Sequence, residues 1–397
     1  MKWEYKTLDQ LGTVSRGKSK HRPRNDPKLF GGKYPFIQTA DVKNADYYIT
    51  KYSDTYNESG LAQSKLWDKG TLCITIAANI ADTGVLAFPA CFPDSIMGFV
   101  PFEGVANTRF IKYCFDRLQR DCKQISQGTA QDNLSWEKLS TIKFCIPEYK
   151  EQCRIADILS AYDDLIENNQ KQIKLLEEAA QRLYKEWFVD LRFPGHENTK
   201  IVDGVPEGWQ WCKVRDVADI NSSALPKNYK EDFIDYVDLG SVRCGHIETR
   251  TRYNLNEAPG RAKRCAKDGD IIWGMVRPNL KAYALVTNPK ETDVFSTGFA
   301  VLSAKKVPYS YLYCAVTQEE FVGYLVNATN GAAYPAVKPV HFEVADILKP
   351  DDKVLEQFHS VADLIFRKIE MLDKQNHNLS EARDLLLPKL MNGEVEV

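Results

Sequence analysis

The sequence lacks the features of several common protein classes. Its ten cysteines include no C-x-x-C pair and no nearby histidine at ligand spacing, so reduced, buried thiols are expected rather than zinc ligands or disulfides. No apolar run approaches the length of a membrane span, and the N-terminus, MKWEYKTLDQ, has no apolar signal core. We therefore expect a cytoplasmic protein, with two to three domains in its 397 residues.

Catalytic motifs are missing as well. No Asn or Asp precedes Pro-Pro-Tyr or Pro-Pro-Phe, and no glycine-rich loop suits S-adenosylmethionine, so DNA methylation by this chain is not expected. Pro93-Asp94 and Pro350-Asp351 lack the following Glu-x-Lys of a nuclease, and the six histidines are isolated. We expect a chain without enzymatic activity, without a metal site and without a cofactor of its own.

One stretch does match a nucleotide-binding motif. Residues 12–19, GTVSRGKS, fit the phosphate-binding pattern G-x-x-x-x-G-K-[ST]. Residues 6–11 are not a buried apolar strand, however, and Pro23 and Pro27 prevent a helix from beginning directly after the motif. ATP binding is therefore not expected.

Residues 148–190 contain neither proline nor glycine and are rich in strong helix formers. Their apolar residues recur at helical spacing, with charged and amide residues on the opposite face, which predicts one long amphipathic helix. About 40 residues at ~1.5 Å each give a rod of roughly 60 Å. A single rod cannot bury its own apolar stripe, so a partner helix is expected.

Residues 351–392 supply that partner. A displacement of 206 residues places Ala156-Asp157 on Ala362-Asp363, and it aligns the apolar positions and a polar interruption in the middle of each helix. Two unrelated amphipathic helices are the alternative. The expected interface of the helix pair consists of Ile155, Ile158, Leu159, Tyr162, Leu165, Ile166, Asn169, Gln172, Ile173 and Leu176, with Val361, Leu364, Ile365, Leu372, Gln375, Asn378, Leu379 and Leu386.

The globular segments repeat in the same way. Trp3 lies 206 residues before Trp209, and Pro147 lies 203 residues before Pro350. Short β-like runs and a helical segment within residues 1–147 indicate a mixed α+β domain, and the repeat extends this interpretation to the second copy. The expected division is a first globular domain at 1–147, a long helix at 148–192, a linker at 193–208, a second globular domain at 209–349 and a C-terminal helix at 350–397.

The predicted fold class is α+β: two similar globular α/β domains separated by two long antiparallel helices that form a coiled coil, with an internal pseudo-two-fold axis. Two similar domains related in this way match two half-sites along duplex DNA.

Positive charge is concentrated in each globular segment, although the net charge is only −2. Residues 16–33 contain seven basic residues against Asp26 alone, and residues 243–267 contain seven against Glu248 and Glu257. A solvated loop is the alternative, but a basic cluster with aromatic neighbours in both repeats favours binding to phosphates. The candidate DNA contacts are Arg16, Lys18, Lys20, Arg22, Arg24, Lys33, Arg243, Arg250, Arg252, Arg261, Lys263 and Arg264.

Several motifs carry a family resemblance. They are Ile155-Ala156-Asp157-Ile158-Leu159 and its repeat Val361-Ala362-Asp363-Leu364-Ile365, the turn Gln127-Gly128-Thr129, Val276-Arg277-Pro278-Asn279-Leu280-Lys281, and the closing LLPKLMNGE of residues 386–394. With these motifs the chain resembles the specificity subunit of Type I restriction–modification enzymes over essentially its whole length. The motifs add Gln127, Thr129, Arg277 and Lys281 to the candidate DNA contacts.

The resemblance implies that each globular domain reads one half of a bipartite DNA target and that the helices measure the spacer between the halves. It also implies two modification (methyltransferase) subunits docked on the helices, joined by restriction/translocase subunits. S-adenosylmethionine, ATP and Mg would then bind to those partners. Two alternatives are a free-standing DNA-binding or scaffold protein without a restriction partner, and a DNA-modifying enzyme with its own reading domains.

Overall fold

The computed structural model describes residues 3–76, 82–125, 136–329 and 335–397. The chain divides into two compact units, one formed by Met1–Asn169 with Gln375–Val397 and the other by Gln170–Lys374. Each unit therefore combines a globular segment with part of both long helices. This division differs from the expected one, in which the helices were separate segments of the chain.

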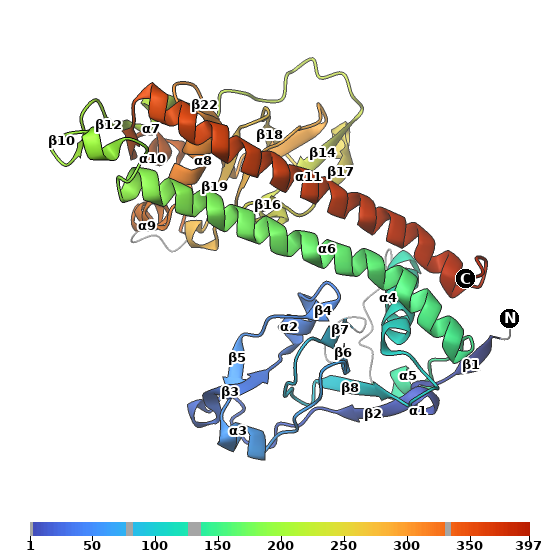
Figure 1. Cartoon of the computed structure of the whole chain (residues 1–397). Helices are drawn as coiled ribbons and strands as arrows, with labels where there is room; N and C mark the ends of the chain where they lie inside the picture. The colour runs from blue at the N-terminus through green and yellow to red at the C-terminus, as the bar shows by residue number, and fades with distance from the viewer. Residues whose placement is uncertain (1–2, 77–81, 126–135, 330–334) are drawn as a thin grey trace. The chain divides into compact units, whose positions relative to one another are not determined.

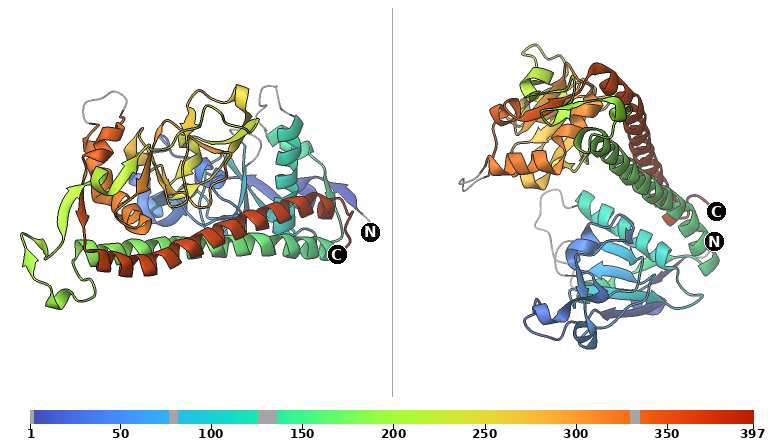
Figure 2. Two further views of the ribbon diagram at one scale, coloured as in Figure 1. Left: turned by 90° about the horizontal axis from the view of Figure 1, so that it is seen from above. Right: turned by 60° about the vertical axis from the view of Figure 1, so that its left-hand side comes forward.

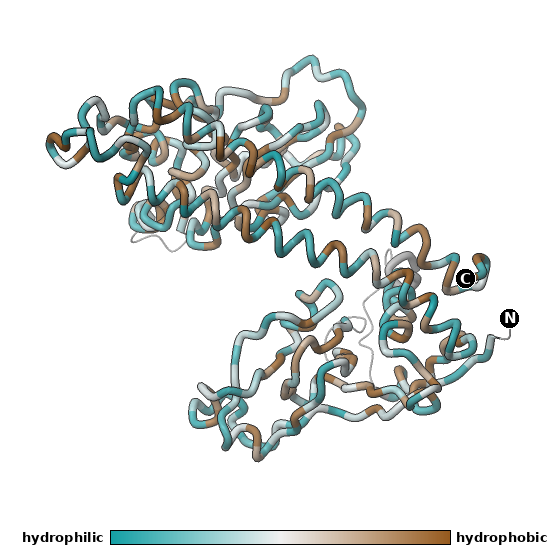
Figure 3. Tube along the Cα trace, viewed as in Figure 1, coloured by the Kyte–Doolittle hydropathy of each residue, from teal (hydrophilic) through white to brown (hydrophobic). Residues whose placement is uncertain are grey.

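The two long helices are α6 and α11. Helix α6 spans Tyr149–Tyr184 and continues as the π-helical turn Lys185–Val189, and α11 spans Asp352–Met391. Helices α6 (green) and α11 (red) run side by side in the views of Figures 1 and 2. Apolar positions alternate with polar ones along both helices (Figure 3). Neither helix, nor any other described helix, is long and apolar enough to cross a membrane.

Both helices carry a seam of residues spaced alternately three and four apart, and none of these residues is exposed. This average spacing of 3.5 residues is that of a coiled coil. The seam positions are Gln152, Ile155, Leu159, Tyr162, Ile166, Asn169, Ile173, Leu176, Ala180, Leu183 and Trp187 on the first helix, and Leu355, Phe358, Ala362, Ile365, Ile369, Leu372, Asn376, Leu379, Arg383, Leu386 and Leu390 on the second.

Contacts within each unit make the helices antiparallel. In the first unit Asp163 contacts Arg383, and Asn169, further along α6, contacts Gln375, which is earlier on α11. In the second unit the ring of Phe358, near the start of α11, lies 5.9 Å from the ring of Trp187 at the end of α6.

The expected interface is wrong at several positions. Val361 and Leu364 are 45% and 68% exposed, because the seam uses Ala362 and Ile365, the next residues along the helix. Leu165 also lies at the edge of the seam, with 37% of its surface exposed. The displacement of 206 residues aligns similar residue types, but the period of 3.5 decides which of two adjacent apolar residues faces inward.

The first globular segment is built around one mixed sheet, in the strand order β2-β8-β6-β7-β4, and a separate pair β1-β9 that leads into α6. Its elements are β1 (Glu4–Lys6), α1 (Leu8–Leu11), β2 (Gly12–Arg16), β3 (Phe30–Phe36), α2 (Thr39–Lys43), β4 (Tyr48–Ile49), β5 (Asp54–Tyr56), α3 (Glu58–Ala62), β6 (Leu72–Thr75), β7 (Thr83–Leu86), β8 (Ile96–Pro101), α4 (Thr108–Ile125), α5 (Trp136–Thr141) and β9 (Phe144–Ile146).

The second globular segment repeats this order. Its sheet β13-β22-β19-β20 corresponds to β2-β8-β6-β7, and its pair β12-β23 corresponds to β1-β9. Its elements are β10 (Ile201–Val202), β11 (Val205–Pro206), β12 (Gln210–Lys213), α7 (Val214–Val217), β13 (Ala218–Ile220), β14 (Phe233–Val237), β15 (Val242–Arg243), β16 (His246–Ile247), β17 (Thr251–Asn254), β18 (Ala262–Arg264), β19 (Ile271–Gly274), β20 (Tyr283–Leu285), β21 (Asp293–Ser296), β22 (Phe299–Ala304), α8 (Tyr309–Val316), α9 (Glu319–Asn327), α10 (Pro339–Glu343) and β23 (Asp346–Lys349).

Each globular segment shares its hydrophobic core with the helices of its own unit. In the first unit Phe110 and Phe115 of α4 belong to the same buried cluster as Leu159 of α6 and Leu390 of α11. In the second unit one buried cluster joins Trp273 of β19 to the helix residues, among them Tyr184, Phe358 and Phe366. Each globular segment is therefore packed onto the helix residues of its own unit.

Candidate nucleic-acid interface

The stretch that fits the nucleotide-binding pattern is not a phosphate-binding loop. Gly12–Arg16 form β2, which pairs antiparallel with β8. A Cβ atom at Gly12 would lie 2.3 Å from the carbonyl oxygen of Val100, and one at Gly17 would lie 2.3 Å from that of Phe92. The glycines therefore allow close backbone packing, and the next helical segment, Pro27–Leu29, is a single 3-10 turn.

The first basic cluster follows directly on β2. Arg16, Lys18 and Lys20 are exposed, and none of them forms an ion pair with a residue that the structure describes. The backbone of Lys18 is fixed, because its N–H donates to the Phe92 carbonyl at 2.9 Å and its carbonyl accepts from the Ser64 hydroxyl at 2.7 Å. The loop therefore presents three available cations on an anchored backbone.

Three of the other four basic residues of this cluster are already engaged, whereas Lys28 is exposed without an ion pair to a described residue. Arg24 donates to both oxygens of Asp94, at 2.7 and 2.8 Å, and Arg22 lies 4.0 Å from the same carboxylate. Lys33 lies 3.2 Å from Glu58. Counting charge along residues 16–33 therefore overestimates the positive charge, because these carboxylates come from distant parts of the sequence.

The second basic cluster is partly neutralised as well. Arg252 of β17 donates to Asp235 of β14 at 2.9 and 3.2 Å, and this bond, supported by Thr292, lowers the pKa of the Asp235 carboxyl. Arg250 lies 3.3 Å from Asp293, and Arg243 lies 3.5 Å from Glu248. Arg252 lies on the edge strand β17 and Arg243 on the hairpin of β15 and β16, and the charge of all three arginines is largely compensated.

Three cations of this cluster are available. Arg261, Lys263 and Lys267 are exposed, and none of them forms an ion pair within the part of the chain that the structure describes. Lys263 lies on the edge strand β18, while the neighbouring Arg264 is only half-exposed.

The candidates taken from the family motifs have different placements. Arg277 is exposed and has a left-handed backbone, with φ 49°, and its N–H donates to the Pro335 carbonyl at 2.8 Å. Lys281 forms an ion pair with Glu319. Gln127 and Thr129 lie outside the residues that the structure describes.

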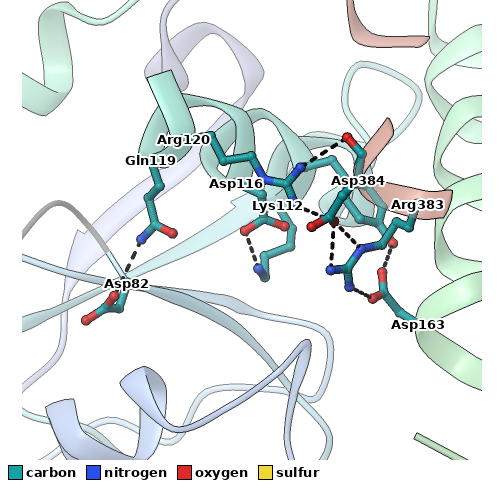
Figure 4. A network of polar contacts seen from close by, with 9 residues as sticks. Asp82, Lys112, Asp116, Gln119, Arg120, Asp163, Arg383 and Asp384 are labelled. Atoms are coloured by element: carbon teal, nitrogen blue, oxygen red, sulfur yellow. Dashed lines mark hydrogen bonds and ion pairs between the residues drawn. The ribbon is translucent and has the colours of Figure 1, made fainter. Parts of the chain in front are cut away.

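A charged network joins the first globular segment to both helices (Figure 4). Arg383 of α11 contacts Asp163 of α6 and also donates to Asp384 at 2.9 Å, and Asp384 pairs with Arg120 of α4. The Tyr113 hydroxyl donates to the second oxygen of Asp163 at 2.5 Å. Burial raises the pKa of the Asp163 carboxyl, and the guanidinium of Arg383 opposes that shift.

The second unit contains an analogous contact. His246 of β16 lies between the helices, with Nε2 3.2 Å from Glu177 of α6 and Nδ1 3.7 Å from Asp373 of α11. The two carboxylates, Asp373 first, raise the pKa of His246 to about 10, so the imidazole is protonated at neutral pH.

The polar break in the helix pair is smaller than expected. Asn169 is only 2% exposed and donates to Gln375 at 3.2 Å and to Asn376 at 2.9 Å. Asn378 is exposed, so the expected group of four amides does not form. The repeat alignment predicted that Asn169, Gln172, Gln375 and Asn378 would meet; of these, Asn169 and Gln375 do form a hydrogen bond, and Asn376 provides the second acceptor.

Sequence reasoning missed the charged residues that join helices to recognition segments. Arg383 could have been found, since it occupies a seam position where an apolar residue is expected. His246 could not, because nothing in its local sequence indicates two carboxylates on distant helices. Among the described residues, no group of three His, Cys, Asp or Glu side chains could hold a metal ion.

Known proteins share this fold, in which two similar sheets pack on a pair of long helices and each globular segment carries exposed cations. Residues 1–178 match the family model described as the Type I restriction modification DNA specificity domain. The crystal structure of the Type-I restriction-modification system S subunit from M. genitalium has the same fold, with a TM-score of 0.55 and 17% identity, and the alignment covers 98% of this chain and 96% of that one.

Two specificity subunits are similar to this chain in sequence. The Type I restriction enzyme MjaIX specificity subunit of Methanocaldococcus jannaschii is 27% identical, with 100% of this chain and 94% of that protein covered. The MjaVIII specificity subunit of the same organism is 25% identical, covering 72% of this chain and 70% of that one. The resemblance to the specificity subunits of Type I restriction–modification enzymes is thereby confirmed, and it extends over the whole chain.

Proposed function

We propose that this chain is the sequence-specific DNA-binding subunit of a Type I restriction–modification complex. Each globular segment reads one half of a bipartite target, and the helix pair holds the two readers at a fixed spacing. The observation that carries this proposal is the duplication: two segments of the same topology, each with exposed cations and each packed onto the same helices.

The partners in this proposal are duplex DNA, two methyltransferase subunits and the restriction/translocase subunits. S-adenosylmethionine, ATP and Mg are bound by those partners, and this chain contributes specificity without catalysis. Full-length similarity to specificity subunits supports this assignment over a free-standing DNA-binding or scaffold protein.

Exchange of one reader tests the proposal. Replacing residues 1–147 by the matching segment of a relative should change one half of the recognised sequence, and replacing residues 209–349 should change the other half. The measurement is mapping of methylated sites in a host that carries the complex. An exchange that alters both halves together, or neither, contradicts the assignment of one half to each segment.

Absence of catalysis is tested separately. The purified chain should hydrolyse no ATP, and Lys18→Ala should make no difference to this result, because Lys18 follows a strand and not a phosphate-binding loop. ATP hydrolysis that persists through purification and is lost in Lys18→Ala would refute this part of the proposal.

A further inference from the structure

The first globular segment contains a cavity beside its available cations. The cavity has a volume of about 350 Å³ and lies between the loop of Arg24 and Asn25, strand β3, and the residues Gln38, Asp54 and Ser95. This volume is within the range of small-ligand sites in proteins, which begins at about 300 Å³.

The charges of the cavity are compensated internally. Its arginine, Arg24, is held by both oxygens of Asp94, and its carboxylate, Asp54, accepts from the Gln38 amide at 2.5 Å. A phosphate would meet no uncommitted cation here, and a divalent metal would find a single carboxylate. The cavity therefore suits an uncharged ligand.

One wall of the cavity is aromatic and the rim is polar. Phe36 stacks on Tyr56 with ring centroids 4.1 Å apart, and Phe30 lies 5.1 Å from the same ring. The side chain of Asn25 is exposed and forms no hydrogen bond with any residue that the structure describes. A flat, uncharged ring with hydrogen-bonding edges fits this combination, and a nucleobase is such a ring.

The position of the cavity relates it to DNA. Asn25 and Arg24 belong to the same loop as Lys18 and Lys20, and Arg22 approaches the carboxylate of Asp94 that also holds Arg24. A duplex bound by the loop has two kinds of protruding group that can enter a concave site, the backbone phosphates and a base turned out of the stack. The compensated charge excludes the first.

We propose that this cavity receives one base of the bound target, turned out of the duplex, and that Asn25 and Gln38 read its edge. The inference rests on the proposed function and adds a specificity-determining site to it. An amide side chain can donate and accept together, as adenine recognition requires.

Mismatched duplexes test this inference, because a base that is already unpaired costs less to extrude. With the full chain co-expressed with its partner subunits, binding should strengthen about tenfold when one base pair of the first half-site is replaced by a mismatch that keeps the read base. In Asn25→Ala this gain should be lost, together with about tenfold of the preference for the read base.

The matched control is Asn44→Ala, an exposed amide of the same segment outside the cavity, which should behave as the unaltered chain. Phe30→Leu, which removes the ring but fills the space, should also reduce the gain. If every mismatch in the first half-site weakens binding by the unaltered chain, the inference is overturned while the proposed function stands. If the unaltered chain shows no preference among matched duplexes, both are overturned.

Discussion

Replacing Asn169 by leucine would test whether the polar contact inside the helix pair fixes the alignment of the two helices. In the native register the Asn169 amide donates two hydrogen bonds, to Gln375 and Asn376, which contribute about 1 kcal/mol each. A buried leucine would contribute roughly 2 kcal/mol by apolar burial, and the exposed Gln375 could bond to water instead. The free energy of unfolding should therefore change by about 1 kcal/mol or less.

The substitution should change the stability of slipped helix alignments more than that of the native alignment. A slip of one heptad, about 10 Å along the helix, in the direction that sets Asn169 against Ile369 leaves the buried amide unsatisfied, which costs about 1–3 kcal/mol. Leucine removes this penalty. Because 10 Å corresponds to about three base pairs, the variant should bind targets with a spacer altered by three base pairs about tenfold better than the native chain does.

Asn168→Leu is the matched control, since Asn168 is exposed on the same helix and lies outside the seam. The assays are thermal unfolding and binding to a series of duplexes with graded spacer length. The reasoning is refuted if Asn169→Leu melts several degrees lower than Asn168→Leu and keeps the same strict dependence on spacer length.

Three further outcomes follow from the contacts. Lys18→Ala should lower the slope of log K for DNA binding against log salt concentration by about one. Arg252→Ala should lower that slope by less, because the guanidinium of Arg252 is already held by Asp235. Equal slopes for the two variants would show that the Arg252–Asp235 ion pair opens on binding. The stabilisation from protonated His246 is complete below its ordinary pKa of 6.5 and is lost as pH rises through about 10. The melting temperature of the native chain should therefore fall relative to that of His246→Gln as pH rises from 6.5 to about 10. Parallel curves of melting temperature against pH would refute this. Asp163→Asn should lower the free energy of unfolding, measured by chemical denaturation, by roughly 2 kcal/mol, because Arg383 stays partly buried with one carboxylate fewer. Adding Arg383→Met should recover much of this loss. An unchanged free energy of unfolding in Asp163→Asn would mean that the site is hydrated.

Much of the architecture could be read from the sequence. Two stretches of about 40 residues with a continuous apolar stripe can only be stable as a packed pair, so the helices and their pairing follow from local composition. The duplication was visible because residue types recur at a displacement of 206 or 203. The prolines after residues 12–19 also indicated that no long helix follows this stretch directly, and the structure has only the 3-10 turn Pro27–Leu29 there.

Register and the choice between adjacent residues depended on the tertiary structure. Val361 and Ala362 are both apolar, but the 3.5-residue seam buries only the second. Asn169 donates to Gln375 and Asn376 while Asn378 stays exposed, because an antiparallel register is set by the sum of contacts along both helices and not by any local pattern.

By itself, the sequence determined that this protein consists of two similar α+β segments on a long helix pair, without catalytic motifs and with basic residues in each segment. The tertiary structure decided which of those basic residues remain available. Arg24 meets a carboxylate 70 residues away, and Arg250 meets one 43 residues away, once the strands have paired. Charge can be counted along a chain, but its compensation depends on distance in space, which only the folded arrangement fixes.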